Sequence, residues 1–353
     1  MDFVKLNTVK DENWPWIRRF VNVNGVKAGK KITGGVETDE DAVVVFVTQK
    51  LPKGHADLKK RDIVPERIDG VKTDIIQVGE IWALSMVPIP KAVSTGIDRT
   101  RKFDPVLGGI STGHPNITAG TLSIVQDTDQ GVFYLSNAHV FSDCNDGYKG
   151  DYLCQPGKYD DPAYVLNYFA ELHEWVPIYF EGGNGGQCPF TNLALSTLNG
   201  IARSLGSYQR FYSKNIRAED KNYVDAAIAK PLLNYRNYDA LNILEVGKVT
   251  GIEDPVLGMR AEKSGRSSAV NDGTVNGVDV TVTVNYGDKG IATLYKQGTT
   301  TPMLIGGDSG SHILNKANKK AIGLGFAGSG HISIFNPIRT VWELFKLNPV
   351  FPK

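Results

Sequence analysis

The sequence predicts a mostly β protein with a C-terminal helix, preceded by a small α/β unit. After about residue 105, short apolar runs alternate with Gly, Asn and Asp, which is typical of all-β folds. Residues 278–286 alternate apolar and polar side chains, as a half-buried strand does. Near the end, Asn336 is expected to cap a helix with Pro337 in its first turn and one apolar face over 338–345.

The first 87 residues form the expected α/β accessory unit. Ala42–Val47 is a β-branched run of the kind found in buried strands, and a second strand is expected over Thr73–Val78. Asp69-Gly70 marks the turn before that second strand. Residues 88–105 contain several prolines and basic residues, so they are expected to be an exposed linker to the 106–353 domain.

Composition excludes several classes of protein. The 353 residues are 41% hydrophobic and carry a formal net charge of +1, which gives no electrostatic basis for binding nucleic acid or a membrane. No apolar run approaches the roughly 20 residues that span a bilayer. The N-terminus has no signal-peptide pattern, and Cys144, Cys154 and Cys188 are odd in number, so free thiols and a cytoplasmic location are expected.

Neither metal nor cofactor is expected. The cysteines lack the paired short spacing of a zinc site. The segment 143–147 (Asp-Cys-Asn-Asp-Gly) is like a calcium loop, but its glycine falls one place early and no glutamate follows at the twelfth position.

Within the 106–353 region, strands are expected over 118–125, 132–136, 246–252 and 321–326. A long insertion, 142–221, interrupts the first half and contains all three cysteines. Apolar residues at helical spacing within 190–205 predict a helix that packs over this insertion.

The stretch 304–311, Leu-Ile-Gly-Gly-Asp-Ser-Gly-Ser, is the strongest candidate for chemistry. Small neighbours allow a sharp backbone turn at Ser309 and leave the amides of Gly307 and Ser309 free to face a developing oxyanion. A serine hydroxyl needs a base, and the base needs an orienting group. Taken alone, the octet is equally consistent with an ordinary turn between two strands.

A base and an acid are available upstream. His139 follows the predicted strand 132–136, a position where a structural histidine is the commoner outcome. Asp225 lies within the apolar run 224–229, and a buried carboxylate needs a strong partner. That partner is either a histidine imidazole or the amides of a neighbouring loop. His312 lies too close to Ser309 along the chain to be an independent base.

The order His139, Asp225, Ser309 resembles that of the chymotrypsin- and trypsin-like serine proteases of the PA clan. The motif 135–139 (Leu-Ser-Asn-Ala-His) is similar to the histidine motif of this family, and 307–310 (Gly-Asp-Ser-Gly) to its nucleophile loop. The segments 150–157 and 265–268 resemble a bacterial trypsin-like branch related to the narrow-leaf type peptidases of plants.

The resemblance implies two six-stranded antiparallel barrels, at about 106–235 and 240–353, with the site between them. Ser309 would be the nucleophile, His139 the general base and Asp225 its orienting acid, with Gly307 and Ser309 forming the oxyanion hole. It also implies that Met303, six residues before the serine, lies at the base of the primary pocket. The implied substrate-binding residues are completed by Phe326, Ala327, Gly328 and Ser333.

The expected function is therefore an intracellular serine endopeptidase acting on protein or peptide substrates. Met303 has no charge to pair with Arg or Lys, so small or apolar residues are expected at the cleaved position rather than tryptic specificity. Two alternatives stay open: a catalytically idle binding or regulatory module, and an esterase or acyltransferase with the same triad. The long step from His139 to Asp225 leaves Asp143 and Asp146 as alternative acids.

Asp308, next to the serine, is expected to be buried and to have an internal partner, because an unmatched buried carboxylate is costly. Val106-Leu107-Gly108-Gly109 superficially resembles the new N-terminus that secreted relatives create by cleavage, but a cut there would fall after Pro105. We therefore expect the intact chain to be competent without N-terminal cleavage.

Overall fold

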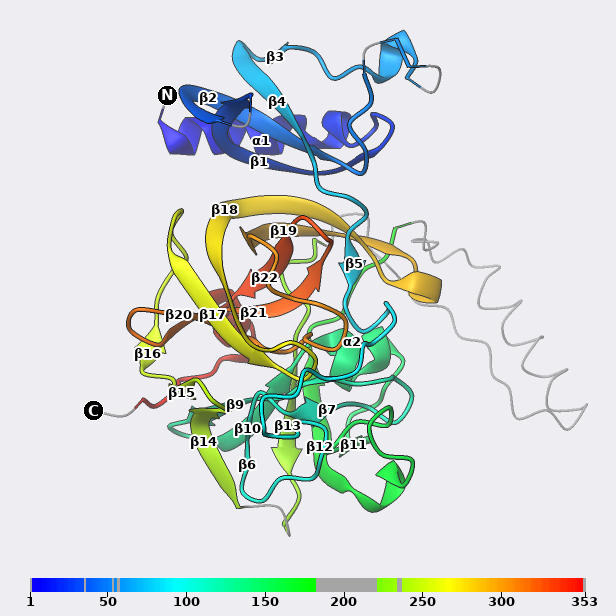
Figure 1. The fold of residues 1–353 in the computed structure, drawn as a ribbon, viewed down its shortest axis with the longest axis vertical. Helices are drawn as coiled ribbons and strands as arrows, with labels where there is room; N and C mark the ends of the chain where they lie inside the picture. Colours follow the sequence, from blue (N-terminus) through cyan, green and yellow to red (C-terminus); the bar gives the residue numbers. More distant parts are fainter. Residues whose placement is uncertain are drawn as a thin grey trace, which may run out of the picture.

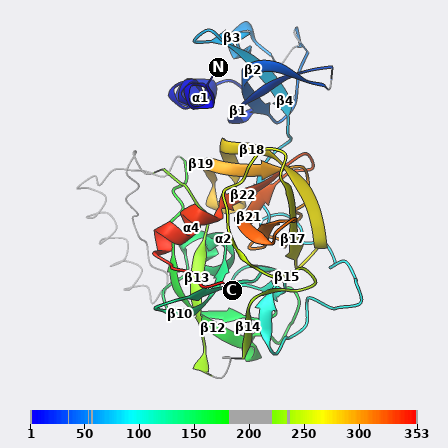
Figure 2. The same cartoon turned by 90° about the vertical axis from the view of Figure 1, so that its left-hand side faces the viewer.

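The computed structural model describes residues 2–34, 36–52, 54–55, 58–181, 221–233 and 237–351. The N-terminal unit lies at one end of the molecule and the strands of the first half of the 106–353 region at the other, with the strands of its second half between them (Figure 1). A quarter turn shows the same order, with helix α4 beside the strands of the second half (Figure 2).

The helices are α1 (Phe3–Ile17), α2 (Ala138–Phe141) and α4 (Ile338–Phe345). The strands up to the first half are β1 (Val23–Thr33), β2 (Val36–Val47), β3 (Arg67–Ile68), β4 (Val71–Gln77), β5 (Trp82–Ala83), β6 (Val106–Gly108), β7 (Ser111–Thr112), β8 (Gly120–Thr121), β9 (Ser123–Asp127), β10 (Gly131–Ser136), β11 (Tyr152–Cys154), β12 (Tyr168–Trp175) and β13 (Ala227–Pro231). The later strands are β14 (Tyr238–Ile243), β15 (Gly247–Lys248), β16 (Gly251–Ile252), β17 (Arg260–Gly265), β18 (Ala269–Asn285), β19 (Ile291–Thr300), β20 (His312–Asn315), β21 (Lys320–Gly328) and β22 (Ser333–Pro337).

The N-terminal unit is a helix packed on a short sheet. The expected strand at 42–47 is the buried end of β2, and the turn before β4 falls at Asp69-Gly70, where both residues have positive φ. The core of the unit joins α1 to β1, β2 and β4 through buried side chains that include Leu6, Trp14 and Val45. The α/β character expected for this unit is thus observed.

The second half closes on itself. Antiparallel pairings run β17–β20–β21–β22–β19–β18, and β18 pairs back to β17, which makes a ring of six strands. The first half forms a five-stranded sheet, β11–β12–β13–β10–β9, with two smaller sheets beside it. The prediction of a mostly β fold with two β-rich halves is confirmed.

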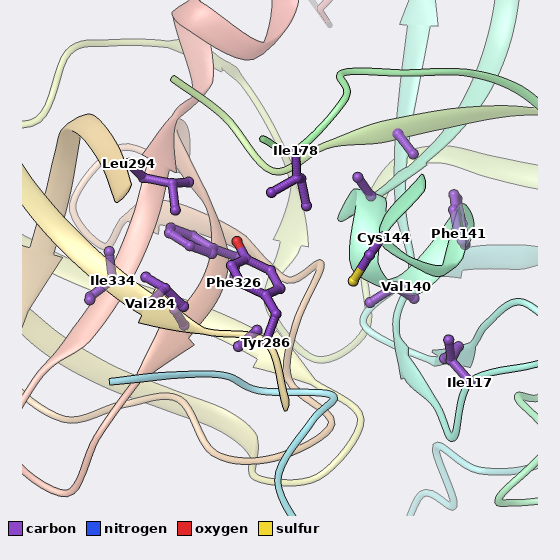
Figure 3. Close-up of a cluster of buried hydrophobic side chains, with 14 of the residues drawn as sticks. Ile117, Val140, Phe141, Cys144, Ile178, Val284, Tyr286, Leu294, Phe326 and Ile334 are labelled. Atoms are coloured by element: carbon purple, nitrogen blue, oxygen red, sulfur yellow. The ribbon is translucent and has the colours of Figure 1, made fainter. Parts of the chain in front are cut away.

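The N-terminal unit continues the sheet of the second half. β1 pairs antiparallel with β18 at Gly25↔Val282 and Val26↔Thr281. A Cβ on Gly25 would come within 2.9 Å of the Thr281 carbonyl oxygen, so only glycine allows this approach. One buried cluster accordingly includes side chains from all three parts of the chain. Figure 3 shows Val140 and Cys144 of the first half facing Val284 and Phe326 of the second.

Three details differ from the sequence predictions. The strand expected over 118–125 is divided into β8 and β9, and the one over 246–252 into β15 and β16. Asn336 does not cap α4: it lies in β22, Pro337 occupies the cap position, and no side chain caps the helix. The side chain of Asn336 is instead committed to hydrogen bonds with Asp225. The helix expected within 190–205 lies outside the described residues.

His312 in β20 is a buried histidine that makes the fold sensitive to acid. Neither ring nitrogen has a hydrogen-bond partner among the described residues, and burial lowers the pKa of the ring to about 4. The unfolded chain, with an ordinary histidine pKa of about 6.5, binds the proton more readily over this window. The free energy of unfolding should therefore fall as the pH drops from about 6.5 to about 4.

Replacing the ring with an apolar side chain should remove this contribution. We predict that His312→Leu unfolds in urea with a shallower dependence of stability on pH between about 4 and 6.5 than the parent protein. The difference should be at most a few kcal/mol, at about 1.4 kcal/mol per pKa unit. Identical pH slopes for the two proteins would show that His312 is not kept neutral by the fold.

Candidate active site

Three segments far apart in the sequence meet at one buried point. His139 lies in α2, directly after β10 ends, and Asp225 lies two residues before β13. Because β10 pairs with β13, their ends bring these two residues together. Ser309 lies in the loop between β19 and β20 of the second half. All three side chains are fully buried.

The three side chains form a hydrogen-bonded chain. His139 Nε2 lies 2.8 Å from Ser309 Oγ, and His139 Nδ1 contacts Asp225 Oδ2 on its other side. The backbone amide of His139 also donates to Asp225 Oδ1 over 3.1 Å. This arrangement holds the imidazole between a carboxylate and a hydroxyl, with Nδ1–H facing the acid and Nε2 facing the alcohol.

Two asparagines, Asn137 and Asn336, hold the backbone of Asp225, and sequence reasoning missed both of them. Asn137 Nδ2 donates to the Asp225 carbonyl oxygen over 2.7 Å. Asn336 Oδ1 accepts from the Asp225 amide over 3.0 Å, and its Nδ2 donates to the Asp225 carbonyl over 3.1 Å. Only Asn137, within the motif 135–139, had a local sequence signal. The role of Asn336 depends on β22 lying beside β21, which one sequence does not reveal.

Tyr286, at the end of β18, completes the carboxylate's environment. Its hydroxyl donates to Asp225 Oδ2 over 3.0 Å. Burial, and then the neighbouring carboxylate, raise the pKa of Tyr286 well above its ordinary value, so the phenol stays a donor. The ring lies 6.0 Å from that of His139, at a steep angle. In Figure 3 Tyr286 lies with Phe326 in the middle of the buried cluster.

The loop before the serine is fixed by a second buried carboxylate, Asp308. Lys263 Nζ lies 2.9 Å from Asp308 Oδ2, and both side chains are fully buried. The amides of Ser267 and Ser268 donate to Oδ1 over 2.9 and 3.1 Å. Burial lowers the pKa of Lys263, while the Asp308 carboxylate acts in the opposite direction. Asp308 thus has the internal partner expected from the sequence.

The alternative acids lie elsewhere. Asp143 and Asp146 both pair with Lys289, at 3.2 and 2.7 Å, and Asp146 is largely exposed. Another histidine, His331, is exposed and is not part of the hydrogen-bonded chain of Asp225, His139 and Ser309. Of the carboxylates considered from the sequence, the structure brings Asp225 to His139.

Of the residues expected to bind substrate, Phe326 lies directly beside Ser309. The Phe326 carbonyl oxygen lies 3.1 Å from Ser309 Oγ. Met303 is buried in an apolar cluster with Leu304 and Phe335. The hydroxyl of Ser333 accepts from the amides of Met303 and Leu304, each over 2.9 Å. Ala327 and Gly328 pair with residues 82 and 83 of strand β5.

Neither described cysteine has the environment of a nucleophile. Cys144 and Cys154 are buried free thiols. Burial raises the pKa of Cys154 to about 12 and that of Cys144 well above the ordinary value, so both stay protonated at neutral pH. Within the described ranges no three His, Cys, Asp or Glu side chains group to hold a metal ion.

A serine, histidine and aspartate in this order and geometry, on a mostly β protein with two halves, define the chymotrypsin-like class of serine proteases. The chain resembles that class in these residues and in their geometry. A stretch of 82 residues is 38% identical to glutamyl endopeptidase 2 of Streptomyces griseus. That stretch is 23% of this chain and 40% of the relative, so the match spans less than half of the curated protein. No protein-family model matches the chain.

The comparison with solved structures finds two proteases whose TM-scores lie below 0.5. Thermobifida fusca protease A covers 70% of this chain and 99% of its own length, with 17% identity and a TM-score of 0.43. A glutamic-acid-specific serine protease covers 69% of this chain and 100% of its own length, with 16% identity and a TM-score of 0.43. The narrower relation to plant narrow-leaf type peptidases stays a prediction.

The hydroxyl of Tyr286 offers a direct test of the network around Asp225. Tyr286→Phe removes only the donor to Oδ2, and a hydrogen bond to a charged group contributes about 1.5–3 kcal/mol. We predict about a tenfold or larger fall in the rate at which a fluorophosphonate labels Ser309 in protein whose site is accessible. The control is Tyr148→Phe, which removes a hydroxyl from a residue that is 68% exposed. Equal rates in both variants would show that the Tyr286 hydroxyl does not support the site.

Proposed function

We propose that the chain is a serine endopeptidase that cleaves protein or peptide substrates through an acyl-enzyme intermediate. The observation that carries the proposal is the buried hydrogen-bonded chain from Asp225 through His139 to Ser309, with 2.8 Å between His139 Nε2 and Ser309 Oγ. A serine hydroxyl becomes a useful nucleophile only beside an oriented base, and this geometry supplies both base and orientation.

The geometry gives each residue a role. His139 Nε2 takes the proton as Ser309 Oγ attacks the scissile carbonyl, and later returns it to the leaving amine. Asp225 fixes the tautomer of the ring and stabilises the imidazolium that forms. The amides of Gly307 and Ser309 are the proposed oxyanion donors. Gly307 supports this assignment because its φ of +91° turns the backbone sharply just before the nucleophile.

The residues proposed to form the primary pocket favour an uncharged side chain. Met303, Leu304 and Phe335 belong to one buried apolar cluster, and an unpaired charge placed there would lose its hydration. We therefore propose cleavage after small or apolar residues. The relative named glutamyl endopeptidase raises glutamate as the competing specificity. Peptides that differ only in Leu, Glu or Arg at the cleaved position separate these, and preference for Glu or Arg would contradict the proposal.

The proposal also covers the domain organisation of the chain and its location in the cell. Residues 1–87 are the accessory unit, 88–105 the linker and 106–353 the protease domain. An intracellular, cytoplasmic role is supported by Cys144 and Cys154, which are unpaired thiols of the kind found in reducing compartments. In the described part of the chain, no helix has the length and apolar character needed to cross a membrane.

Substitution of each triad residue tests the mechanism. Ser309→Ala or His139→Ala should lower the turnover rate of a cleaved peptide by about a millionfold, because the triad acts as a unit. Asp225→Asn should cost about ten-thousandfold by disturbing the tautomer. An Asp225→Asn variant with the parental rate would contradict the role given to Asp225.

Two assays separate the proposal from its alternatives. Covalent labelling of Ser309 by a fluorophosphonate is expected for any active serine hydrolase, and its absence even from a chain with an accessible site would favour an idle binding module. Cleavage of a peptide library then separates an endopeptidase from an esterase or acyltransferase. Labelling without any peptide cleavage would contradict the proposal.

A further inference from the structure

Residues 82–84 of the chain occupy the site where a substrate would lie. Strand β5 pairs antiparallel with β21, with Ala83 opposite Ala327 and Trp82 opposite Gly328. Ala327 and Gly328 are the residues expected to hold a substrate backbone. In Figure 1, β5 descends from the N-terminal unit and runs beside the strands of the second half. The segment therefore lies along the substrate-binding strand as an added strand.

The next residue, Leu84, forms hydrogen bonds beside the nucleophile through both its backbone amide and its backbone carbonyl. Its amide donates to the Phe326 carbonyl oxygen over 3.0 Å, and Ser309 Oγ lies 3.1 Å from the same oxygen. Its carbonyl oxygen accepts from the Gly307 amide over 3.3 Å. That amide is one of the two proposed oxyanion donors, so the Leu84 carbonyl lies where a scissile carbonyl would be polarised.

The side chain of Leu84 fills the proposed pocket. It is 4% exposed and belongs to the buried apolar cluster that contains Met303, Leu304 and Phe335. Backbone pairing, the oxyanion contact and the filled pocket agree on one register along the chain. In that register Leu84 is the residue before the bond to be cleaved, and Ser85 is the residue after it.

The chain reverses direction immediately after Leu84. The Met86 amide donates to the Ala83 carbonyl oxygen over 3.0 Å, which closes a turn with Leu84 and Ser85 at its centre. The returning chain packs against Gly306, where a Cβ would come within 2.8 Å of the Pro88 carbonyl oxygen. This packing holds the leaving amine near the site, so cleavage should be slower than for a free peptide of the same sequence.

We propose that Ser309 cleaves the chain's own Leu84–Ser85 peptide bond; this rests on the proposed endopeptidase activity and names its first substrate. Ser309 Oγ attacks the Leu84 carbonyl carbon as His139 takes the hydroxyl proton. The C–N bond then breaks and His139 returns that proton to the Ser85 nitrogen. Water attacks the resulting ester, which frees Ser309 and leaves a Leu84 carboxylate and a Ser85 α-amine.

Two consequences follow. Until the bond is cut and residues 82–84 leave, they exclude external substrates, so the expectation that the intact chain is fully competent is revised. The physical reason is that the Gly307 amide and the apolar pocket already have an occupant. The preferred substrates should be peptides with leucine before the cleaved bond, because Leu84 fills the proposed pocket in the intact chain. External peptides with leucine before the cleaved bond should be accepted once the segment is displaced.

The test compares the full-length parent chain with Ser309→Ala after purification and incubation. Denaturing gels and N-terminal sequencing should find a fragment that begins at Ser85 in the parent and only the uncut chain in Ser309→Ala. The rate should not change with protein concentration, because the bond is cut within one molecule. A cut at another bond, or one that appears only when parent protein is added to Ser309→Ala, would overturn the inference.

A matched pair of variants tests the register. Leu84→Met keeps an apolar side chain of similar size and should be cut at the same bond. Leu84→Arg places a charge in the apolar pocket and should be cut about 100-fold more slowly or not at all. Equal cleavage of both would overturn the assignment of Leu84 to the pocket.

Leu84→Arg also separates a failure of self-cleavage from a failure of the proposed endopeptidase activity. Its pocket should be open, so it should hydrolyse an external leucine peptide and be labelled at Ser309 by a fluorophosphonate. If Leu84→Arg does both while the parent chain stays intact, self-cleavage is wrong and the endopeptidase proposal stands. If Leu84→Arg does neither and the parent stays intact, both proposals fail.

Discussion

The carboxylate of Asp225 is the constraint on which the rest of the site depends. It is fully buried, and an ionised carboxylate without partners would be strongly destabilising there. Its donors come from both halves: the amide and ring of His139 from α2, and the Tyr286 hydroxyl from the end of β18. Meeting the hydrogen-bonding needs of one carboxylate therefore aligns the halves that carry the base and the nucleophile.

The backbone of Asp225 extends this coupling. Asn336 of β22 bonds to both its amide and its carbonyl, while Asn137 of the first half bonds to the same carbonyl. Asp308, one residue before Ser309, fixes the nucleophile loop in a similar way. Lys263 and the amides of Ser267 and Ser268 bind its carboxylate. Two buried carboxylates, Asp225 and Asp308, thus fix the orienting acid and the nucleophile loop.

The sequence could predict what depends on local chemistry. The apolar runs at 42–47, 132–136 and 321–326 are strands, and the order of His139, Asp225 and Ser309 pointed to three residues that the fold brings together. The need of a buried Asp308 for a partner followed from the cost of an unmatched charge, although Lys263 as that partner did not.

What the sequence could not predict depends on contacts between distant strands. Tyr286 lies 61 positions from Asp225, directly after strand β18, and the sequence there gives no local sign of a polar role. Asn before Pro is a common start signal of a helix, and it predicts a helix cap at Asn336. The pairing of β21 with β22 instead buries Asn336, where its side chain accepts a hydrogen bond from the Asp225 amide. The register of residues 82–84 on β21 depends on the N-terminal unit joining the sheet through β1 and β18.

The hydrogen bond between Asp225 and His139 is the contact on which the buried site depends most directly. Proton NMR measures this directly, because a proton shared between Nδ1 and a carboxylate resonates far downfield. A histidine N–H resonance shifted far downfield should be present in the parent protein and in Ser309→Ala, and absent from Asp225→Asn. A parent spectrum without that resonance, or one that Asp225→Asn leaves unchanged, would contradict the account.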